Sequence, residues 1–183
     1  MTPSQSPCFR RAALVGKFPV AGLAALDDSR ALLADVASFL EKCGCEVVLE
    51  ASTAANLDHP HYPALGVDAL GTGCDVCVVL GGDGVPCEGL DALCLGADAY
   101  VQTVIRDDLV KLVPSARLQD ILDYHSSVGQ AGETATRAGV RHLVLTHYVP
   151  SMQPGQEDEW RALAAATFDG NIVLGDDLTT LEI

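Results

Sequence analysis

An acid on a glycine-rich turn is the feature of the sequence best suited to chemistry. Gly81, Gly82, Asp83 and Gly84 directly follow an apolar run at 75–80. Glycine lets a backbone come close to a ligand, and main-chain N–H groups at the start of a helix can bind an anion. The turn therefore predicts a cofactor-binding site for a phosphate or a nucleotide fragment. The alternative is structural, because Asp often accepts hydrogen bonds from the backbone of its own turn.

Cysteine and histidine side chains suggest a second kind of chemistry, which is metal binding. The seven cysteines include two close pairs, Cys43 with Cys45 and Cys74 with Cys77. The first pair is spaced too tightly for the usual zinc knuckle, and cysteines beside apolar segments commonly act as small hydrophobes. We interpret the pairs as structural. The two histidines at 58–61 are interpreted as solvated.

Alternating sequence patterns predict the elements that position these residues. Strand-like runs and helical stripes follow one another along the chain, which favours parallel strands joined by right-handed crossovers. The predicted strands are 12–16, 46–50, 75–80, 99–105, 141–146, 171–174 and 178–183. The predicted helices are 27–41, 90–95, 107–112, 126–138 and 154–166, with a polar, turn-rich connection at 51–63. We expect an α/β protein: a three-layer α/β/α sandwich with a doubly wound, mostly parallel, Rossmann-like sheet.

Composition and charge limit the size of the fold and its partners. The 183 residues suit a single domain, 1–183, and a hydrophobic content of 49% with 5% aromatic residues favours helices on a parallel sheet. A net charge of -14 repels phosphate backbones and anionic lipids, so we expect no nucleic acid and no membrane partner. The sequence suggests neither a signal peptide nor a membrane span, so we expect a cytoplasmic protein.

Residues 8–84 resemble the N-terminal domain of NAD kinases. The resemblance is carried by FRRAALVGKF, by SRALLADVASFLEKCGCEVVLE and by CDVCVVLGGDG. It implies a dinucleotide at the Gly81–Gly84 turn, with Asp83 near the phosphoryl acceptor. The family motif continues with Thr, whereas Val85-Pro86-Cys87 stands here, and the Asn-Glu motif and the β-rich second domain are missing. We therefore do not expect NAD as a cofactor.

From about residue 82 to the C-terminus the chain resembles metallo-β-lactamase-fold hydrolases, in the branch of ribonuclease Z and arylsulfatase-like enzymes. Three segments show this resemblance: GDGVPCEGLDALCLGADAYVQTVI, DYHSSVGQAGETATRAGVRHLVLTHYVP and FDGNIVLGDDLTTLEI. The resemblance implies that Asp83 is the bridging metal ligand and His147 the last metal-binding histidine. It also implies that His125 is a catalytic residue that helps to protonate the leaving group. Because the His-x-His-x-Asp-His loop of these enzymes is absent, we expect no required cofactor, with a residual zinc ion as the alternative.

The two resemblances meet at the glycine turn, which leads to the hypothesis of a chimera. An NAD-kinase-like segment at 8–81 and a metallo-β-lactamase-like segment at 82–183 would share one sheet. Pairing across the junction would bury a set of apolar residues, namely Val78, Val79, Leu80, Val101, Val104, Leu143, Val144 and Leu145. We expect a recombined or engineered protein without efficient catalysis, because neither site is complete.

Two other functions remain open beside the inactive chimera, and so does the oligomeric state. One is a metal-binding protein with weak hydrolase activity, in which Asp83, His147 and His125 form the site. Another is a residual NAD- or phosphate-binding module at the glycine turn. Finally, truncated half-folds expose sheet edges or helix faces, so a homodimer is also expected.

Overall fold

The structure is a computed structural model that describes residues 9–16, 23–57, 61–80 and 86–183, with the main chain alone at 23–29. Contacts between residues divide the chain into two compact units, Met1–Gly82 and Asp83–Ile183, which we call the first and second units. The predicted site at Gly81, Gly82, Asp83 and Gly84 lies outside the described residues.

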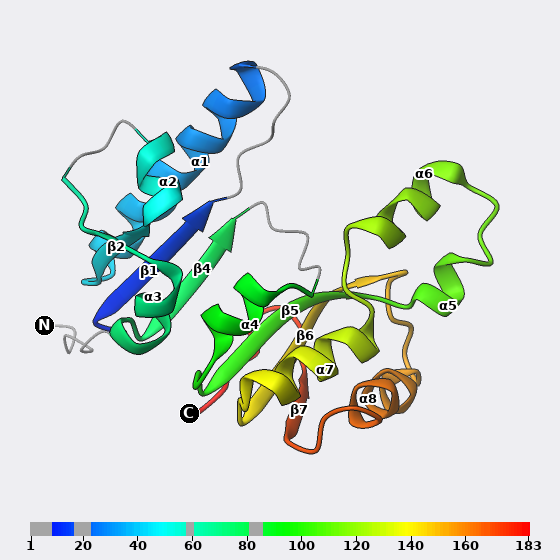
Figure 1. Ribbon diagram of the computed structural model, residues 1–183. Coiled ribbons are helices and arrows are strands. Elements are labelled where there is room, and N and C mark those ends of the chain that lie inside the picture. Colours follow the sequence, from blue (N-terminus) through cyan, green and yellow to red (C-terminus); the bar gives the residue numbers. More distant parts are fainter. Residues whose placement is uncertain (1–8, 17–22, 58–60, 81–85) are drawn as a thin grey trace, which may run out of the picture. The chain divides into compact units, whose positions relative to one another are not determined.

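The first unit contains a parallel four-stranded sheet and three helices among its described residues (Figure 1). Its elements are β1 (Arg11–Gly16), α1 (Leu23–Lys42), β2 (Glu46–Glu50), α2 (Ala51–Asn56), β3 (Ala64–Leu65), α3 (Val67–Gly73) and β4 (Val76–Leu80). The strands lie in the order β3-β2-β1-β4. Leu33 and Ala37 of α1 pack with Leu14 and Leu49 of the sheet. These two α1 residues are four positions apart and so share one helical face.

The second unit contains a parallel three-stranded sheet in the order β5-β6-β7. Its elements are α4 (Glu88–Cys94), β5 (Ala99–Ile105), α5 (Asp107–Val110), α6 (Ala116–Gln119), the 3-10 helix η1 (Asp120–Asp123), α7 (Val128–Ala138), β6 (His142–Val149), α8 (Glu157–Ala165) and β7 (Asn171–Leu174). Leu143 and Leu145 of β6 share one core with Ala135 of α7 and Trp160 of α8. None of the helices within the described ranges is long and apolar enough to cross a bilayer.

The predicted α/β class with parallel strands is confirmed, but the described strands pair in two sheets rather than in one. β4 is the edge strand of the first sheet and β5 the edge strand of the second. Two residues of the expected core lie on these edge strands and are exposed, Val79 of β4 by 44% and Val101 of β5 by 62%.

Short elements account for other differences from the sequence-based expectation. The stretch 51–63 was predicted as a turn-rich connection, yet it contains α2. The predicted last strand, 178–183, has no regular secondary structure. β6 continues to Val149, three residues beyond its predicted end. That extension carries His147.

Ser127 begins α7 with a capping box, as the sequence around 125–127 indicated. Its hydroxyl accepts a hydrogen bond from Gln130 N at 3.2 Å, and the Gln130 side chain accepts one from Ser127 N at 2.9 Å. Ser127→Ala should therefore lower the free energy of unfolding by about 1 kcal/mol in a urea titration. Ser115→Ala is the matched control, because Ser115 precedes α6 without a side-chain capping bond. Equal losses in the two variants would contradict the assigned cap.

Candidate functional site

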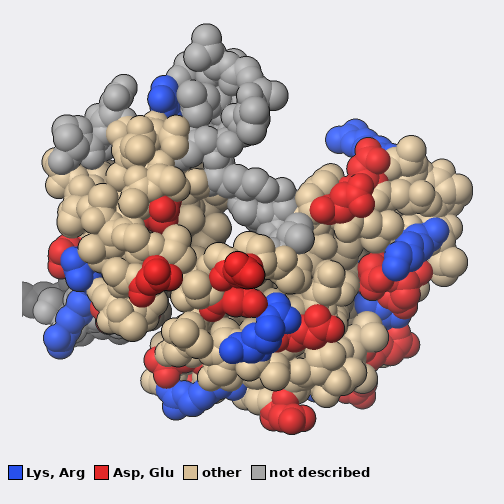
Figure 2. Space-filling model, in the orientation of Figure 1, with Lys and Arg blue, Asp and Glu red and all other residues tan. Residues whose placement is uncertain are grey.

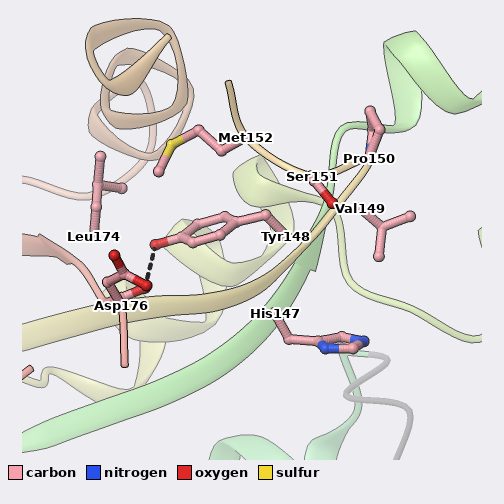
Figure 3. A pocket seen from close by; sticks show the side chains of 9 residues that line it. His147, Tyr148, Val149, Pro150, Ser151, Met152, Leu174 and Asp176 are labelled. Carbon is pink, nitrogen blue, oxygen red and sulfur yellow. Dashed lines mark hydrogen bonds between the residues drawn. The ribbon is translucent and has the colours of Figure 1, made fainter. Parts of the chain in front are cut away.

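A pocket of roughly 650 Å³ opens at the carboxyl ends of β6 and β7 (Figure 3). Nine residues line it: His147, Tyr148, Val149, Pro150, Ser151, Met152, Leu174, Gly175 and Asp176. The carboxyl ends of parallel strands are the usual place for a ligand site in α/β proteins. Of the residues predicted to form a site, His147 lies here.

His147 lies on a β-bulge. Thr103 pairs with Thr146, whereas Ile105 pairs with Val149, so β6 has an extra residue between these two pairs. The φ of His147 is 49°, in the left-handed region that side chains other than glycine rarely adopt. The side chain is exposed, and in Figure 3 it points away from the ring of Tyr148. Such strained backbone tends to occur at functional sites, which supports a functional role for His147.

Hydrogen bonds on both sides hold the end of β6 in place. Arg106 N donates to Val149 O at 2.8 Å, just beyond the bulge. The hydroxyl of Tyr148 lies 2.7 Å from Leu145 O and 3.0 Å from Gly175 O, so its single proton can be donated to either carbonyl. Gly175 N donates to Leu145 O at 2.8 Å. The ends of β6 and β7 are therefore fixed to each other at the pocket.

Tyr148 is a hydrogen-bond donor in this arrangement. Burial raises its pKa, and the negative charge of Asp176 raises the pKa further. The phenol therefore keeps its proton at neutral pH and is not a base. Its ring packs edge-on against Trp160, with centroids 5.1 Å apart. We interpret Tyr148 as a support for the pocket wall.

Asp176 is an acid of the pocket that the sequence interpretation did not single out. It follows Gly175 at the end of β7, which repeats the Gly-Asp order of residues 82–83. Asp176 N donates to Thr179 Oγ1 at 2.8 Å, and the Asp176 carboxylate accepts from Asp177 N at 2.8 Å. These bonds also suit an acid with only a turn-forming role. The sequence signal that could have identified Asp176 is an acid that directly follows a glycine at the end of a strand.

His125 lies beside the end of β5 and is not among the residues lining the pocket. Ile105 N donates to Ser126 O at 3.0 Å, and Ile105 forms a parallel bridge with Ser127. Because the other partner of Ile105 is Val149 of β6, the segment with His125 lies on the opposite side of β5 from β6. Nδ1 of His125 is buried, with no hydrogen-bond partner among the described residues. A role of His125 in protonating a leaving group stays a prediction.

The residues that the structure describes do not by themselves form a metal centre. A catalytic zinc ion usually has three protein ligands, and no three His, Cys, Asp or Glu side chains come together in the described part of the chain. His147 and Asp176 line one pocket, but in Figure 3 the imidazole points away from the carboxylate. Asp83, the expected companion of His147, is outside the described residues. The zinc site at Asp83 and His147 therefore stays a prediction.

The chain is similar to ribonuclease Z proteins of mycobacteria, although no known family profile matches it. A ribonuclease Z of Mycolicibacterium gilvum strain PYR-GCK is 58% identical over 127 residues, which are 69% of this chain and 44% of that protein. A putative ribonuclease Z of Mycobacterium tuberculosis strain CDC 1551 / Oshkosh is 54% identical over 130 residues, covering 70% of this chain and 57% of that protein. The chain thus spans about half the length of the curated relatives it matches.

One similar solved structure is the metallo-β-lactamase fold protein YhfI from Bacillus subtilis. It is 14% identical, with a TM-score of 0.38, over 91% of this chain and 75% of that one.

The similarity to ribonuclease Z is not confined to residues 82–183. The matched 127 residues are more than the second unit contains, so the match extends into the first unit. The expected resemblance to these hydrolases is therefore supported over a longer stretch than predicted. This extension reaches past the junction predicted at residue 82. The NAD-kinase resemblance of residues 8–81 and the chimera find no support among the relatives described above, and both stay predictions.

Proposed function

We propose that the chain is a metal-dependent hydrolase of the ribonuclease Z kind, with its reaction site at the pocket where β6 and β7 end. The observation that carries this proposal is the identity of 58% over 127 residues to a ribonuclease Z. Such similarity favours the hydrolase alternative over a protein without catalysis. The bulge at His147 supports the choice of pocket, because it presents an exposed imidazole at the carboxyl end of a strand.

The described residues supply part of what such a site needs. His147 offers an imidazole, and Asp176 offers a carboxylate on the wall of the same pocket. Tyr148 ties the two strand ends together through its hydroxyl. By resemblance Asp83 is a further ligand, and it lies outside the described residues.

His147→Ala should remove both zinc and activity. We expect the wild-type chain to retain zinc after dialysis and to hydrolyse the phosphodiester bis(p-nitrophenyl) phosphate. The His147→Ala variant should lose the metal, with kcat/KM reduced by about 100-fold or more, because outer partners of metal ligands alone are worth about 10- to 100-fold. Zinc is measured by mass spectrometry and hydrolysis by the absorbance of nitrophenolate.

His142→Ala is the matched control on the same strand. His142 lies at the other end of β6, where its Nδ1 is 2.9 Å from the amide nitrogen of Asn171. This variant should keep the zinc content and the activity of the wild type. A wild-type chain that binds no zinc and does not hydrolyse this phosphodiester would refute the proposed function and favour the inactive chimera.

A further inference from the structure

The side chain of Arg106 joins several elements beside the pocket, and the role inferred for it rests on the proposed function. We propose that Arg106 is a positioning residue for the hydrolysis, which acts by holding the bulge that carries His147. Arg106 is not among the nine residues that line the pocket, so the proposal gives it no contact with the substrate. Its effect on the reaction passes through the strand ends that it fixes.

The main chain around Arg106 is bonded to both segments that contain the predicted site histidines. Arg106 N donates to Val149 O at 2.8 Å on the β6 side, directly beyond the bulge. Ile105 N donates to Ser126 O at 3.0 Å on the opposite side of β5, next to His125. The end of β5 is therefore held between the two segments, and a shift of this end would move both.

The guanidinium of Arg106 fixes this strand end to α5 and α8. Nε and Nη2 donate to the two carboxylate oxygens of Asp108 at 2.8 and 2.7 Å, and Nη1 donates to a Glu159 oxygen at 3.3 Å. The guanidinium carbon lies 5.7 Å from the centre of the Trp160 ring, within cation–π range. That ring makes the edge contact with Tyr148 at the bulge. One side chain thus links the ends of β5 and β6 with the starts of α5 and α8.

Burial separates Arg106 from the ordinary ion pairs of the surface. On the face shown in Figure 2, basic groups lie beside acidic ones, and such exposed pairs contribute little to stability. The side chain of Arg106 is only 10% exposed, whereas those of Asp108 and Glu159 are 54% and 62% exposed. A planar guanidinium that binds one carboxylate through two hydrogen bonds has a defined orientation. This geometry suits a side chain that sets the position of its neighbours.

Arg106→Met tests the role, because it keeps an unbranched side chain over Trp160 and removes the three side-chain hydrogen bonds. The acids left behind are exposed, so no buried charge loses its partner. The kcat for bis(p-nitrophenyl) phosphate should fall about 10-fold, as for residues that orient reactive groups, while KM changes less than about 2-fold. The hydrogen-exchange protection of the amide at residue 106, which is bonded to Val149 O, should also fall about 10-fold. NMR spectroscopy of the isotope-labelled chain in heavy water measures this exchange.

Arg137→Met is the matched control in the same unit. Arg137 also binds one carboxylate through two hydrogen bonds, to Asp91 at 2.8 and 3.1 Å, but it joins α7 to α4. This variant should leave both kcat and the exchange at residue 106 unchanged. Asp108→Asn is a milder second variant at an exposed acid, and it should reproduce both effects of Arg106→Met at about 3-fold each. If Arg106→Met does not fold, Asp108→Asn decides in its place.

The exchange at residue 106 separates this inference from the proposed function. Exchange in Arg106→Met that matches the wild type, or faster exchange with an unchanged kcat, would overturn the positioning role alone. An equal loss of protection at Gly175 N, which is bonded to Leu145 O before the bulge, would indicate general unfolding and would also overturn it. If the wild-type chain does not hydrolyse the phosphodiester, the proposed function fails instead, and the exchange alone decides whether Arg106 holds the bulge.

Discussion

Trp160→Ala is expected to lower the free energy of unfolding by about 3–5 kcal/mol. Trp160 is 1% exposed and is the largest fully buried side chain of the described residues. Its removal leaves a cavity in the core that contains Leu143 and Leu145, and it takes away the edge contact of Tyr148. Because domains are stable by only about 5–15 kcal/mol, this loss should leave the second unit close to unfolding. Urea titration followed by circular dichroism measures it.

Two further variants separate the cavity from other effects of the Trp160 substitution. Leu163→Ala lies on the same helix at a side chain that is 38% exposed, and it should cost about 1 kcal/mol or less. Trp160→Phe should cost about 1–2 kcal/mol, because Trp160 Nε1 has no hydrogen-bond partner among the described residues and so loses none. If Trp160→Ala cost no more than Leu163→Ala, the core described for the second unit would be incorrect.

Elements with a strong local pattern were predictable from the sequence. The strands β2 (Glu46–Glu50), β5 (Ala99–Ile105) and β7 (Asn171–Leu174) have the bounds that their apolar runs predicted. Each is a short apolar run beside turn-forming or polar residues, which limits where the strand can end. By contrast, α2 was missed because its capping residue is Glu50, the last residue of a strand, rather than one of the usual capping residues.

Features that depend on pairing between strands were not predictable from the sequence. Alternation indicated that Val79 and Val101 are apolar strand residues, but it cannot show that each lies on an edge strand. The bulge at His147 arises from the register between β5 and β6, which no local pattern encodes. Asp176 was missed because residues 178–183 were interpreted as a strand, so the Gly-Asp sequence before it was not recognised as the end of the sheet.

A buried carboxylate of the first unit provides a pH-dependent test of stability. Glu50 accepts hydrogen bonds from Ser52 N at 2.8 Å, Thr53 N at 2.8 Å and Thr53 Oγ1 at 3.0 Å. Thr53 Oγ1 in turn accepts from Gly16 N at 2.9 Å, so the cap of α2 is tied to the end of β1. Glu50→Ala should therefore cost about 2–3 kcal/mol at neutral pH, because it removes a cap and leaves buried donors unpaired.

The penalty of the isosteric variant Glu50→Gln should depend on pH in a defined direction. Burial raises the pKa of Glu50, but the hydrogen bonds from Ser52 and Thr53 outweigh it, so the pKa is lowered overall. A lowered pKa means that the carboxylate stabilises the fold at neutral pH and that this stabilisation is lost as the pH falls through the folded-state pKa. Urea titrations should thus show a penalty of about 1–2 kcal/mol at neutral pH that shrinks in acid. Glu46→Gln, at the exposed start of the same strand, should cost about 0.5 kcal/mol or less throughout. A Glu50→Gln penalty that stays constant into acid would show that the negative charge does not stabilise this cap.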